Sequence, residues 1–496
     1  MSNPPPSHPD LQAVARQVMI ERGFQPDFPP PVLAQAAELQ KESNGNTDAD
    51  GLRDLRNLLW SSIDNDTSKD LDQIEVAEQL PNGDVRVLIG IADVDAKVPQ
   101  KTPIDQHASL ETTTVYTGVR NFSMIPEVLS TNLTSLNEEQ DRSAMVIEFV
   151  VSSSGVLKSE DVYPALVRNK AQLAYSSVGN WLGGTGDAPA KVATSADLQA
   201  QIKLQDTTAQ ALRKLRFENG ALNIDTVEVR PVFLSDKSID VVKQERNRAS
   251  ELIEDFMIAA NGVVARKLLP VSSIRRIVKT PERWDRIVAL AAQNGGSLPP
   301  NPDSKALNEF LMQRKNENPV TFADLSLSVI KLMGPGQYVL ERPGDPEQGH
   351  FGLAVQDYTH STAPNRRFAD MVTHRILKAL LAQLRIGGGK QFAPPYSDTE
   401  LEGIATNCTT KEDAARKVER EMNKRIAAVA MQPHIGEQFQ AVVTGASSKG
   451  TFVRVLKPLV EGMLVQGAKG LDVGDTLTVK LIRTNVQNGF IDFAKA

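Results

Sequence analysis

Four aspartates crowd the segment IDNDTSKDLDQIE, which spans positions 63–75. They are Asp64, Asp66, Asp70 and Asp72. Like charges this close repel one another unless a cation neutralises them, and hard cations such as Mg²⁺ prefer oxygen ligands. The spacing is not that of an EF-hand, because the sixth position is not glycine and no glutamate closes the loop. The cluster therefore indicates either a Mg²⁺ site or a solvated acidic loop, and the segment alone leaves both open.

Two neighbouring cations, Arg366 and Arg367, lie in the segment HFGLAVQDYTHSTAPNRRFADMVTHR, positions 350–375. A helical pattern beginning near Pro364 follows, with a cap from Ser361, Thr362 or Asn365 and an apolar stripe at Phe368, Val372, Ile376 and Leu380. A helix N-terminus favours anions, so two arginines there point to a bound phosphate. Pairing with acidic residues of the body is the equally open alternative.

An aromatic pair with a cation lies in TTTVYTGVRNF, positions 112–122. Tyr116, Arg120 and Phe122 could present a stacking face and a charge to a single-stranded nucleic acid, because every base has a π-face. Core packing is the alternative, and the spacing alone favours it.

The net charge of −6 argues at first against a nucleic-acid partner. The acidic excess, however, lies before residue 166, and the remainder of the chain is net basic. The single cysteine, Cys408, excludes an internal disulfide and fits a reducing cytosol, so we expect a cytoplasmic protein. The sequence shows no signal peptide and no run of roughly 18 apolar residues, and we expect no membrane partner.

The pattern of elements predicts an α+β fold. Apolar residues at helical spacing predict a helix from Leu11 to Met19 and a second one around residues 32–39. Short β-type runs dominate residues 52–166, and long helical patterns dominate 198–384. The last stretch, from His434, returns to five short strands punctuated by glycine, which is typical of a small closed barrel of the OB-fold type.

Taken together, these segments resemble the ribonuclease II family, the RNB-domain 3′→5′ exoribonucleases. The resemblance covers roughly residues 52–433 and is carried by several separated motifs in the expected order. The matching pieces are IDNDTSKDLDQ, GIADV (90–94), TTTVY followed by MIPEVLSTNLTSL, LIEDFMIAAN (252–261) and THSTAPNRRFADMVTHR. It implies a short helical segment at 1–50, an RNB catalytic domain at 51–433 and an RNA-binding OB-fold of the S-one type at 434–496.

The resemblance also implies an activity: Mg²⁺-dependent, processive hydrolysis of single-stranded RNA from its 3′ end, releasing nucleoside 5′-monophosphates by a two-metal mechanism. It implies that Asp64, Asp70 and Asp72 hold the metal and that Arg366 stabilises charge on the scissile phosphate. Family roles in substrate binding fall on Tyr116, which would stack on the 3′-terminal nucleotide, and on Tyr175 and Glu254, which would read the sugar 2′-OH. We add Arg367 and, in the barrel, Phe452 as RNA-binding candidates, and we expect a monomer.

Three features depart from the family pattern. Gln73 stands where a further aspartate is usual, so its carbonyl would be an uncharged metal ligand, and a catalytically weak RNA-binding protein is the alternative reading. Ile224 stands where an aromatic usually clamps the terminal base with Tyr116. Helices replace the expected tandem cold-shock domains before Leu52, and they could form a helix-turn-helix-like element or simply pack on the body.

Overall fold

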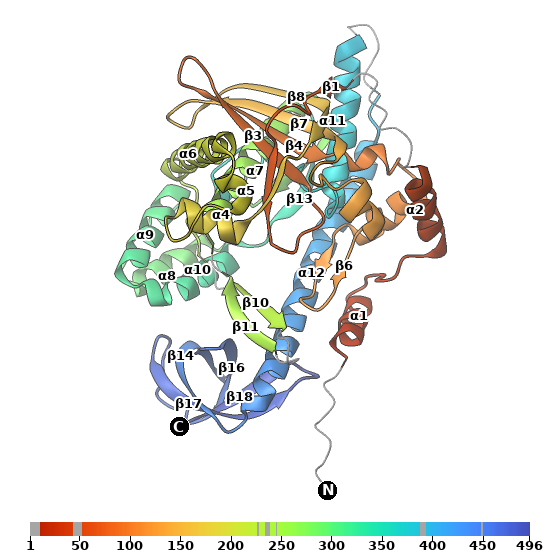
Figure 1. The fold of residues 1–496 in the computed structure, drawn as a ribbon. Helices are drawn as coiled ribbons and strands as arrows, with labels where there is room; N and C mark the ends of the chain where they lie inside the picture. Colours follow the sequence, from red (N-terminus) through yellow and green to blue (C-terminus); the bar gives the residue numbers. More distant parts are fainter. Residues whose placement is uncertain are drawn as a thin grey trace.

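The computed structural model describes residues 10–42, 52–225, 228–233, 239–244, 246–386, 393–447 and 450–496. A mixed body of helices and sheet lies above a separate β-barrel, and the long helix α12 (Asp398–Met431) connects the two (Figure 1). The expected α+β fold with a C-terminal barrel is confirmed. The expected boundary at residues 50/51 lies outside the described residues. No helix in these ranges is long and apolar enough to cross a bilayer.

A seven-stranded sheet forms the centre of the body. In spatial order its strands are β1 (Arg53–Asp54), β8 (Leu157–Arg168), β7 (Asp141–Val151), β4 (Val85–Ala92), β3 (Gln73–Gln79), β2 (Ser61–Asp64) and β9 (Ala171–Ala174). The five strands from β8 to β2 are antiparallel neighbours, and the two edge strands pair in parallel. Strand β2 ends at Asp64 and β3 begins at Gln73, so the sheet fixes both ends of the acidic loop between them.

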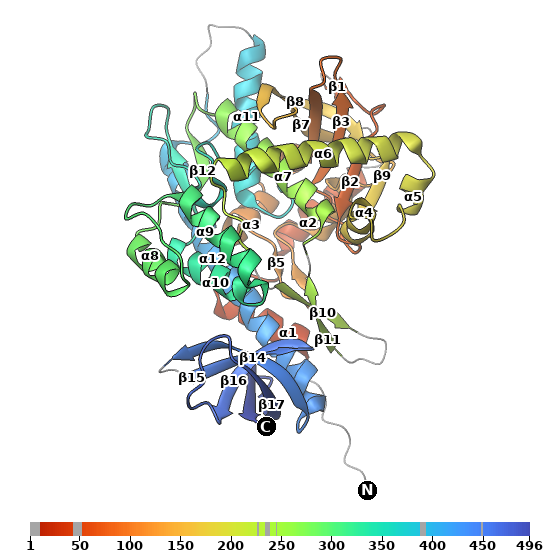
Figure 2. The same cartoon turned by 90° about the vertical axis from the view of Figure 1, so that its left-hand side faces the viewer.

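Two helices, α6 (Ala196–Glu218) and α7 (Arg248–Lys267), lie across one side of the sheet (Figure 2). Phe149 on β7 packs edge-to-face on Phe256 of α7, with ring centroids 6.4 Å apart. Helix α7 begins with a capping box, in which the Asn247 side chain accepts from the backbone of Ser250 and the Ser250 hydroxyl accepts from the backbone of Asn247. The cap fixes the end of α7 that faces the acidic segment.

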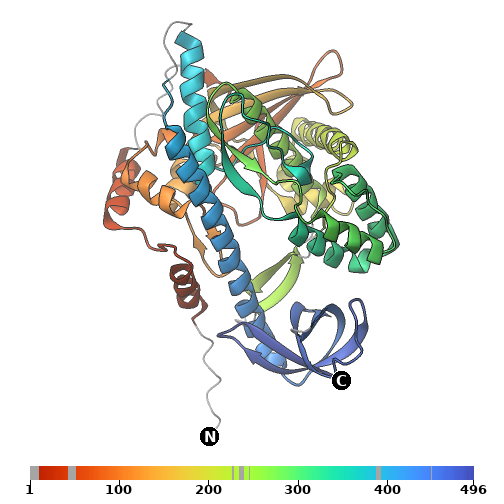
Figure 3. The same cartoon turned by 180° about the vertical axis from the view of Figure 1, so that it is seen from behind.

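Helix α11 (Phe368–Ile386) and α12 run side by side behind the body (Figure 3). The sequence patterns above did not single out α12, although a capping box between Ser397 and Glu400 opens it. Its buried side chains recur at helical spacing from Leu401 to Met431. A helix of 34 residues is about 50 Å long, which lets it reach from the sheet to the barrel.

The C-terminal barrel contains all five expected strands. In spatial order they are β14 (Gln438–Ser447), β15 (Gly450–Leu456), β16 (Leu459–Gln466), β18 (Phe490–Lys495) and β17 (Thr476–Asn485), and they close into a barrel. Phe493 is fully buried in the barrel core, whereas Phe490 is 59% exposed. Phe490 thus lies on the outside of the barrel, although phenylalanine is among the residue types most often buried.

Smaller elements complete the body. A helical unit with its own apolar core comprises α8 (Trp284–Gln293), α9 (Ser304–Glu317) and α10 (Pro319–Met333). The remaining helices are α3 (Pro103–Glu111), α4 (Tyr175–Leu182) and α5 (Ala190–Ala193). Three strand pairs are β5 (Val115–Tyr116) with β6 (Asn121–Phe122), β10 (Glu228–Phe233) with β11 (Ile239–Gln244), and β12 (Ser273–Ile277) with β13 (Gln337–Glu341).

The two predicted N-terminal helices are present as α1 (Leu11–Glu21) and α2 (Pro30–Glu42). They dock on different elements of the body. Val18 and Met19 of α1 are buried in one cluster with Met422 of α12, and α2 packs on α3 through Val32 and Ala36 in the main core. Docking on the body is therefore observed for both helices.

We expect Met19→Ala to loosen α1 from α12. Met19 is 1% exposed, and truncating a core methionine removes about 2 kcal/mol or more of packing free energy. Hydrogen exchange over residues 11–21 should speed up, with little change elsewhere. The matched control is Ile20→Ala, since Ile20 is 42% exposed on the same helix. Equal exchange in both variants would contradict the packing described for α1.

Candidate active site

The acidic segment is a loop between β2 and β3, and its first carboxylate caps it. Asp64, the last residue of β2, accepts from the Asn65 backbone N–H at 2.7 Å and from the Ser68 hydroxyl at 3.0 Å. Burial raises the pKa of Asp64, against these two hydrogen bonds. Asp66 is exposed and accepts from the Ser176 hydroxyl at 3.0 Å.

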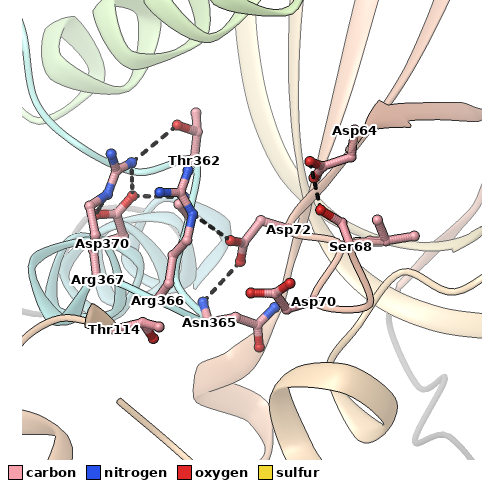
Figure 4. A network of polar contacts seen from close by, with 12 residues as sticks. Asp64, Ser68, Asp70, Asp72, Thr114, Thr362, Asn365, Arg366, Arg367 and Asp370 are labelled. Carbon is pink, nitrogen blue, oxygen red and sulfur yellow. Dashed lines mark hydrogen bonds and ion pairs between the residues drawn. The ribbon is translucent and has the colours of Figure 1, made fainter. Parts of the chain in front are cut away.

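Asp72 is the most deeply buried carboxylate of the loop, with 2% exposure. One oxygen, Oδ1, accepts from the Asn365 backbone N–H at 2.9 Å. The other, Oδ2, lies 3.4 Å from Arg366 Nε and has no hydrogen-bond partner within the described residues (Figure 4). Burial raises the pKa of Asp72 to about 7, although Arg366 and the Asn365 N–H both lower it. The site thus holds a half-satisfied carboxylate at the start of a central strand.

Asp70 lies beside Asp72 in Figure 4, whereas the Asp64 carboxylate lies farther along the loop. The Tyr116 hydroxyl is 3.5 Å from Asp70 Oδ2, at the outer limit of a hydrogen bond. Tyr116 is 38% exposed, whereas Phe122 is 5% exposed and joins the core between α1 and α12. Of the two aromatic side chains in this segment, Tyr116 therefore faces the site and Phe122 packs in the core.

The two arginines before α11 also divide. Arg367 makes a double hydrogen bond to the fully buried Asp370, from Nε at 2.8 Å and from Nη2 at 2.7 Å. Arg366 keeps a side chain that is 44% exposed and, among the residues that the structure describes, forms an ion pair with Asp72 alone. Arg367 is therefore the arginine that pairs with an acidic residue of the body. Arg366 is the cation that has unused donors at the site.

Helix α11 begins at Phe368, four residues later than the start expected near Pro364. The backbone before this helix instead forms hydrogen bonds with other residues of the body. The Asn365 N–H donates to Asp72, the Ala363 N–H donates to Asp370, and the Arg366 carbonyl accepts from the Thr114 N–H. Residues 363–367 consequently form a turn that aims Arg366 at the acidic loop.

The other side of the site is built from α4 and α7. Strand β9 pairs in parallel with β2, and Asp64 is the register partner of Ala174, so Tyr175 at the start of α4 follows directly beside Asp64. The Asn247 side chain of the α7 cap donates to the Tyr175 carbonyl at 3.0 Å. Glu254, two turns into α7, forms an ion pair with Arg246. These contacts bring α4 and α7 together beside the carboxylates.

Two cavities meet along α12. The larger, about 940 Å³, lies between α12, β11 and the barrel and is lined by Phe452 and Phe490. The smaller, about 230 Å³, is lined by Tyr116 and Arg366. Arg416 and Glu419 line both cavities. Phe452 thus lies on a cavity that adjoins the one lined by Tyr116 and Arg366.

Comparisons with known proteins agree with this geometry. Residues 52–383 match the family described as the RNB domain, and residues 437–496 match the RNase II-type exonuclease C-terminal S1 domain. The chain belongs to the RNB-domain family. It is 31% identical over 451 residues to ribonuclease R of Escherichia coli, covering 88% of this chain and 54% of that protein. The chain thus spans about half the length of that curated relative.

Two solved structures have the same fold as this RNB-domain protein. The apo form of Mycoplasma genitalium RNase R is similar with a TM-score of 0.84 at 22% identity, covering 98% of this chain and 78% of that one. Yeast Ssd1, described as a pseudonuclease, is similar with a TM-score of 0.68 at 16% identity, covering 92% of this chain and 56% of that one.

The donor set of the RNB domain fits a hard divalent cation by its chemistry. Asp64, Asp70 and Asp72 offer carboxylate oxygens of the kind that such a cation prefers, and Asp72 Oδ2 is buried without a hydrogen-bond partner in the described part of the chain. Within that same part, no three His, Cys, Asp or Glu side chains converge closely enough to enclose an ion. The chemistry of these oxygen atoms therefore supports a metal site, whereas the described side chains do not already enclose one.

Gln73 and Ile224 are two of the three departures from the family pattern, and they have different surroundings. Gln73 begins β3 with 8% exposure and pairs with Ile91 of β4. Ile224 packs against the apolar core of the α8–α10 unit.

Sequence reasoning missed Glu75. It is fully buried, neither carboxylate oxygen has a hydrogen-bond partner within the described ranges, and burial with the nearby Asp64 charge raises its pKa well above the usual value. A glutamate flanked by Ile74 and Val76 in the strand QIEVAEQ was the available signal.

We expect Asp72→Asn to stabilise the metal-free protein at alkaline pH. Because the folded pKa is raised to about 7, the folded state holds the proton where the unfolded chain has lost it, so stability falls as pH rises from about 4 to about 7. The neutral amide avoids that loss. The free energy of unfolding of the variant should exceed that of the wild type by about 1–4 kcal/mol at pH 8, and this difference should become smaller towards pH 5.

Urea unfolding in EDTA across that pH range measures the gain. Asp66→Asn is the control, because Asp66 is exposed and should show little difference at any pH. A gain for Asp72→Asn that does not depend on pH would contradict the burial argument.

Proposed function

We propose that this RNB-domain protein is a Mg²⁺-dependent exoribonuclease. It hydrolyses single-stranded RNA processively from the 3′ end and releases nucleoside 5′-monophosphates. The observation that carries the proposal is the adjoining of the two cavities at Arg416 and Glu419, since a strand lying in the barrel-side cavity has a route to Tyr116 and Arg366. These two side chains in turn lie against Asp70 and Asp72 of the acidic loop. Membership of the RNB-domain family supports the same reaction.

The residues of the chain divide the work by position. Arg366 has free donors beside Asp72 and offsets the charge that develops on the scissile phosphate. Asp72 in turn orients Arg366 and, with Asp64 and Asp70, would hold the metal. When bound, two Mg²⁺ ions would supply an activated water and stabilise the leaving 3′ oxygen in an in-line displacement. Arg367, held by Asp370, contributes by fixing the turn and contacts RNA only at its remaining donors.

Substrate contacts follow from the walls of the site. Tyr116 offers an exposed ring beside Asp70 for stacking on the terminal base. Tyr175 and Glu254, on α4 and α7, are the proposed readers of the sugar 2′-OH, which distinguishes RNA from DNA. Phe452 stacks on a more distant base of the same strand in the larger cavity. Because one chain carries all of these groups, we propose that it acts as a monomer.

A second candidate function is RNA binding with weak or no catalysis. Gln73 favours it, because an amide carbonyl brings no charge to the metal. The structural similarity to yeast Ssd1, described as a pseudonuclease, shows that the fold also occurs in a protein described in that way.

A 5′-labelled single-stranded RNA distinguishes these functions. With Mg²⁺ we expect the full-length band to be replaced by a short 5′-labelled end product with few intermediates, because removal from the 3′ end is processive, and with EDTA we expect no reaction. Asp72→Asn should lower the rate at least about a hundredfold, because charge stabilisation at the reacting phosphate is lost, while RNA affinity stays within twofold.

Three results would go against the exonuclease. Intact RNA in the presence of Mg²⁺ would favour the binding protein, and internal fragments would indicate an endonuclease. Full activity of Asp72→Asn would refute the assignment of the metal ligands.

A further inference from the structure

A row of cations follows one face of α12 near its lower end. Lys417, Arg420, Lys424 and Arg425 lie at positions i, i+3, i+7 and i+8, which a helix of 3.6 residues per turn places on one side. Arg22, just after α1, joins them across a cavity of about 370 Å³. Figure 3 shows α1 beside the lower half of α12 and the barrel at its end.

The positive charge of this face is largely uncompensated. Among the described residues that line the cavity, the one carboxylate is Glu421, which bonds Arg22 at 2.9 Å and Arg425 at 2.7 Å. Lys417, Arg420 and Lys424 make no ion pair with any residue that the structure describes. Cations this close repel one another, so the face favours a polyanion that can contact several of them at once.

An exposed aromatic ring completes the face. Phe490 is 59% exposed and lines the same cavity. The backbone before this ring lies against α12, because a Cβ on Gly489 would be only 2.8 Å from Lys424 Cβ. Gly489 also has a positive φ of 67°, which glycine adopts without strain. An exposed ring beside unpaired cations is the combination that binds nucleic acid through stacking and phosphate contacts.

The face adjoins the route proposed for the strand that is degraded. Arg420, Lys424 and Phe490 line both this cavity and the larger one, which adjoins the cavity of Tyr116 and Arg366. Arg22, Lys417 and Arg425 line only the outer cavity. RNA that reaches the larger cavity therefore passes directly beside unpaired charge on the far side of α12.

We propose that this outer cationic face, made of Arg22, Lys417, Arg420, Lys424, Arg425 and Phe490, binds RNA backbone that is not threaded towards the active site. The proposal rests on the proposed function only for the identity of the threaded strand. The ligand is the ribose-phosphate backbone, and it comes either from the 5′ part of the same strand or from the second strand of a duplex. The length and pairing of the RNA distinguish these two sources.

The test measures binding of the full-length chain carrying Asp72→Asn, so that RNA is not consumed. The probes are an 8-nucleotide single strand, a 40-nucleotide single strand and a duplex with an 8-nucleotide 3′ overhang. In this background we compare Arg22→Gln/Lys417→Gln, which changes two residues of the outer cavity alone. Lys214→Gln, a surface lysine on α6, is the control for the loss of charge elsewhere.

We expect the double variant to bind the longer RNAs about three- to tenfold more weakly at 0.1 M salt. The slope of log Kd against log salt should fall by about two, because two phosphate contacts are lost. Affinity for the 8-nucleotide strand should not change. Weaker binding of the duplex alone identifies the second strand, and weaker binding of both longer RNAs identifies the flank of the same strand.

Unchanged affinity and an unchanged salt slope for both longer RNAs would overturn the proposal. Because Arg22 also pairs with Glu421, changing Arg22 could loosen α1 and weaken binding indirectly. The single variant Lys417→Gln leaves that pair intact, and it should lower the slope of log Kd against log salt by about one. Lys417→Arg should restore wild-type binding. A wild-type chain that shortens no RNA would refute the proposed function but would leave this binding result standing.

Discussion

The Asp72 carboxylate links the central sheet to the turn before α11, and the site depends on this one contact. Burying a charge at 2% exposure is costly, and the Asn365 N–H and Arg366 offset only part of that cost. Removing Asp72 would leave the turn without the acceptor that holds residue 365, and Arg366 would lose its direction. The interaction therefore fixes geometry more than it adds stability. A buried, half-satisfied carboxylate of this kind is typical of a functional site rather than of a structural ion pair.

The contrast between Arg366 and Arg367 follows from the same constraint. Both precede α11, but Asp370 on the first turn of the helix takes up Arg367 at two atoms. The backbone bonds of the turn then leave Arg366 directed the other way, with its side chain 44% exposed. One arginine thus fixes the turn and its neighbour keeps free donors, which is how two identical side chains come to have different roles.

Some of this site could be predicted from the sequence. Repulsion among the loop aspartates pointed to the carboxylates, and the glycine-punctuated strands predicted the barrel. The sequence could not separate Arg366 from Arg367, because the difference depends on where Asp370 lies in space. Helix α12 was missed although its capping box was readable. The exposure of Phe490 could not be predicted, because burial in a barrel depends on the closure of strands far apart in the chain. Glu75 was missed because a glutamate in a strand is normally on a solvated face.

Calorimetric titration of Mg²⁺ into the metal-free protein at pH 8 is the most direct test that Asp72 forms a metal site. The account predicts saturable binding to the wild type and at least about tenfold weaker binding to Asp72→Asn, with the exposed Asp66→Asn close to wild type. Equal Mg²⁺ affinity in the wild type and Asp72→Asn would contradict the central claim.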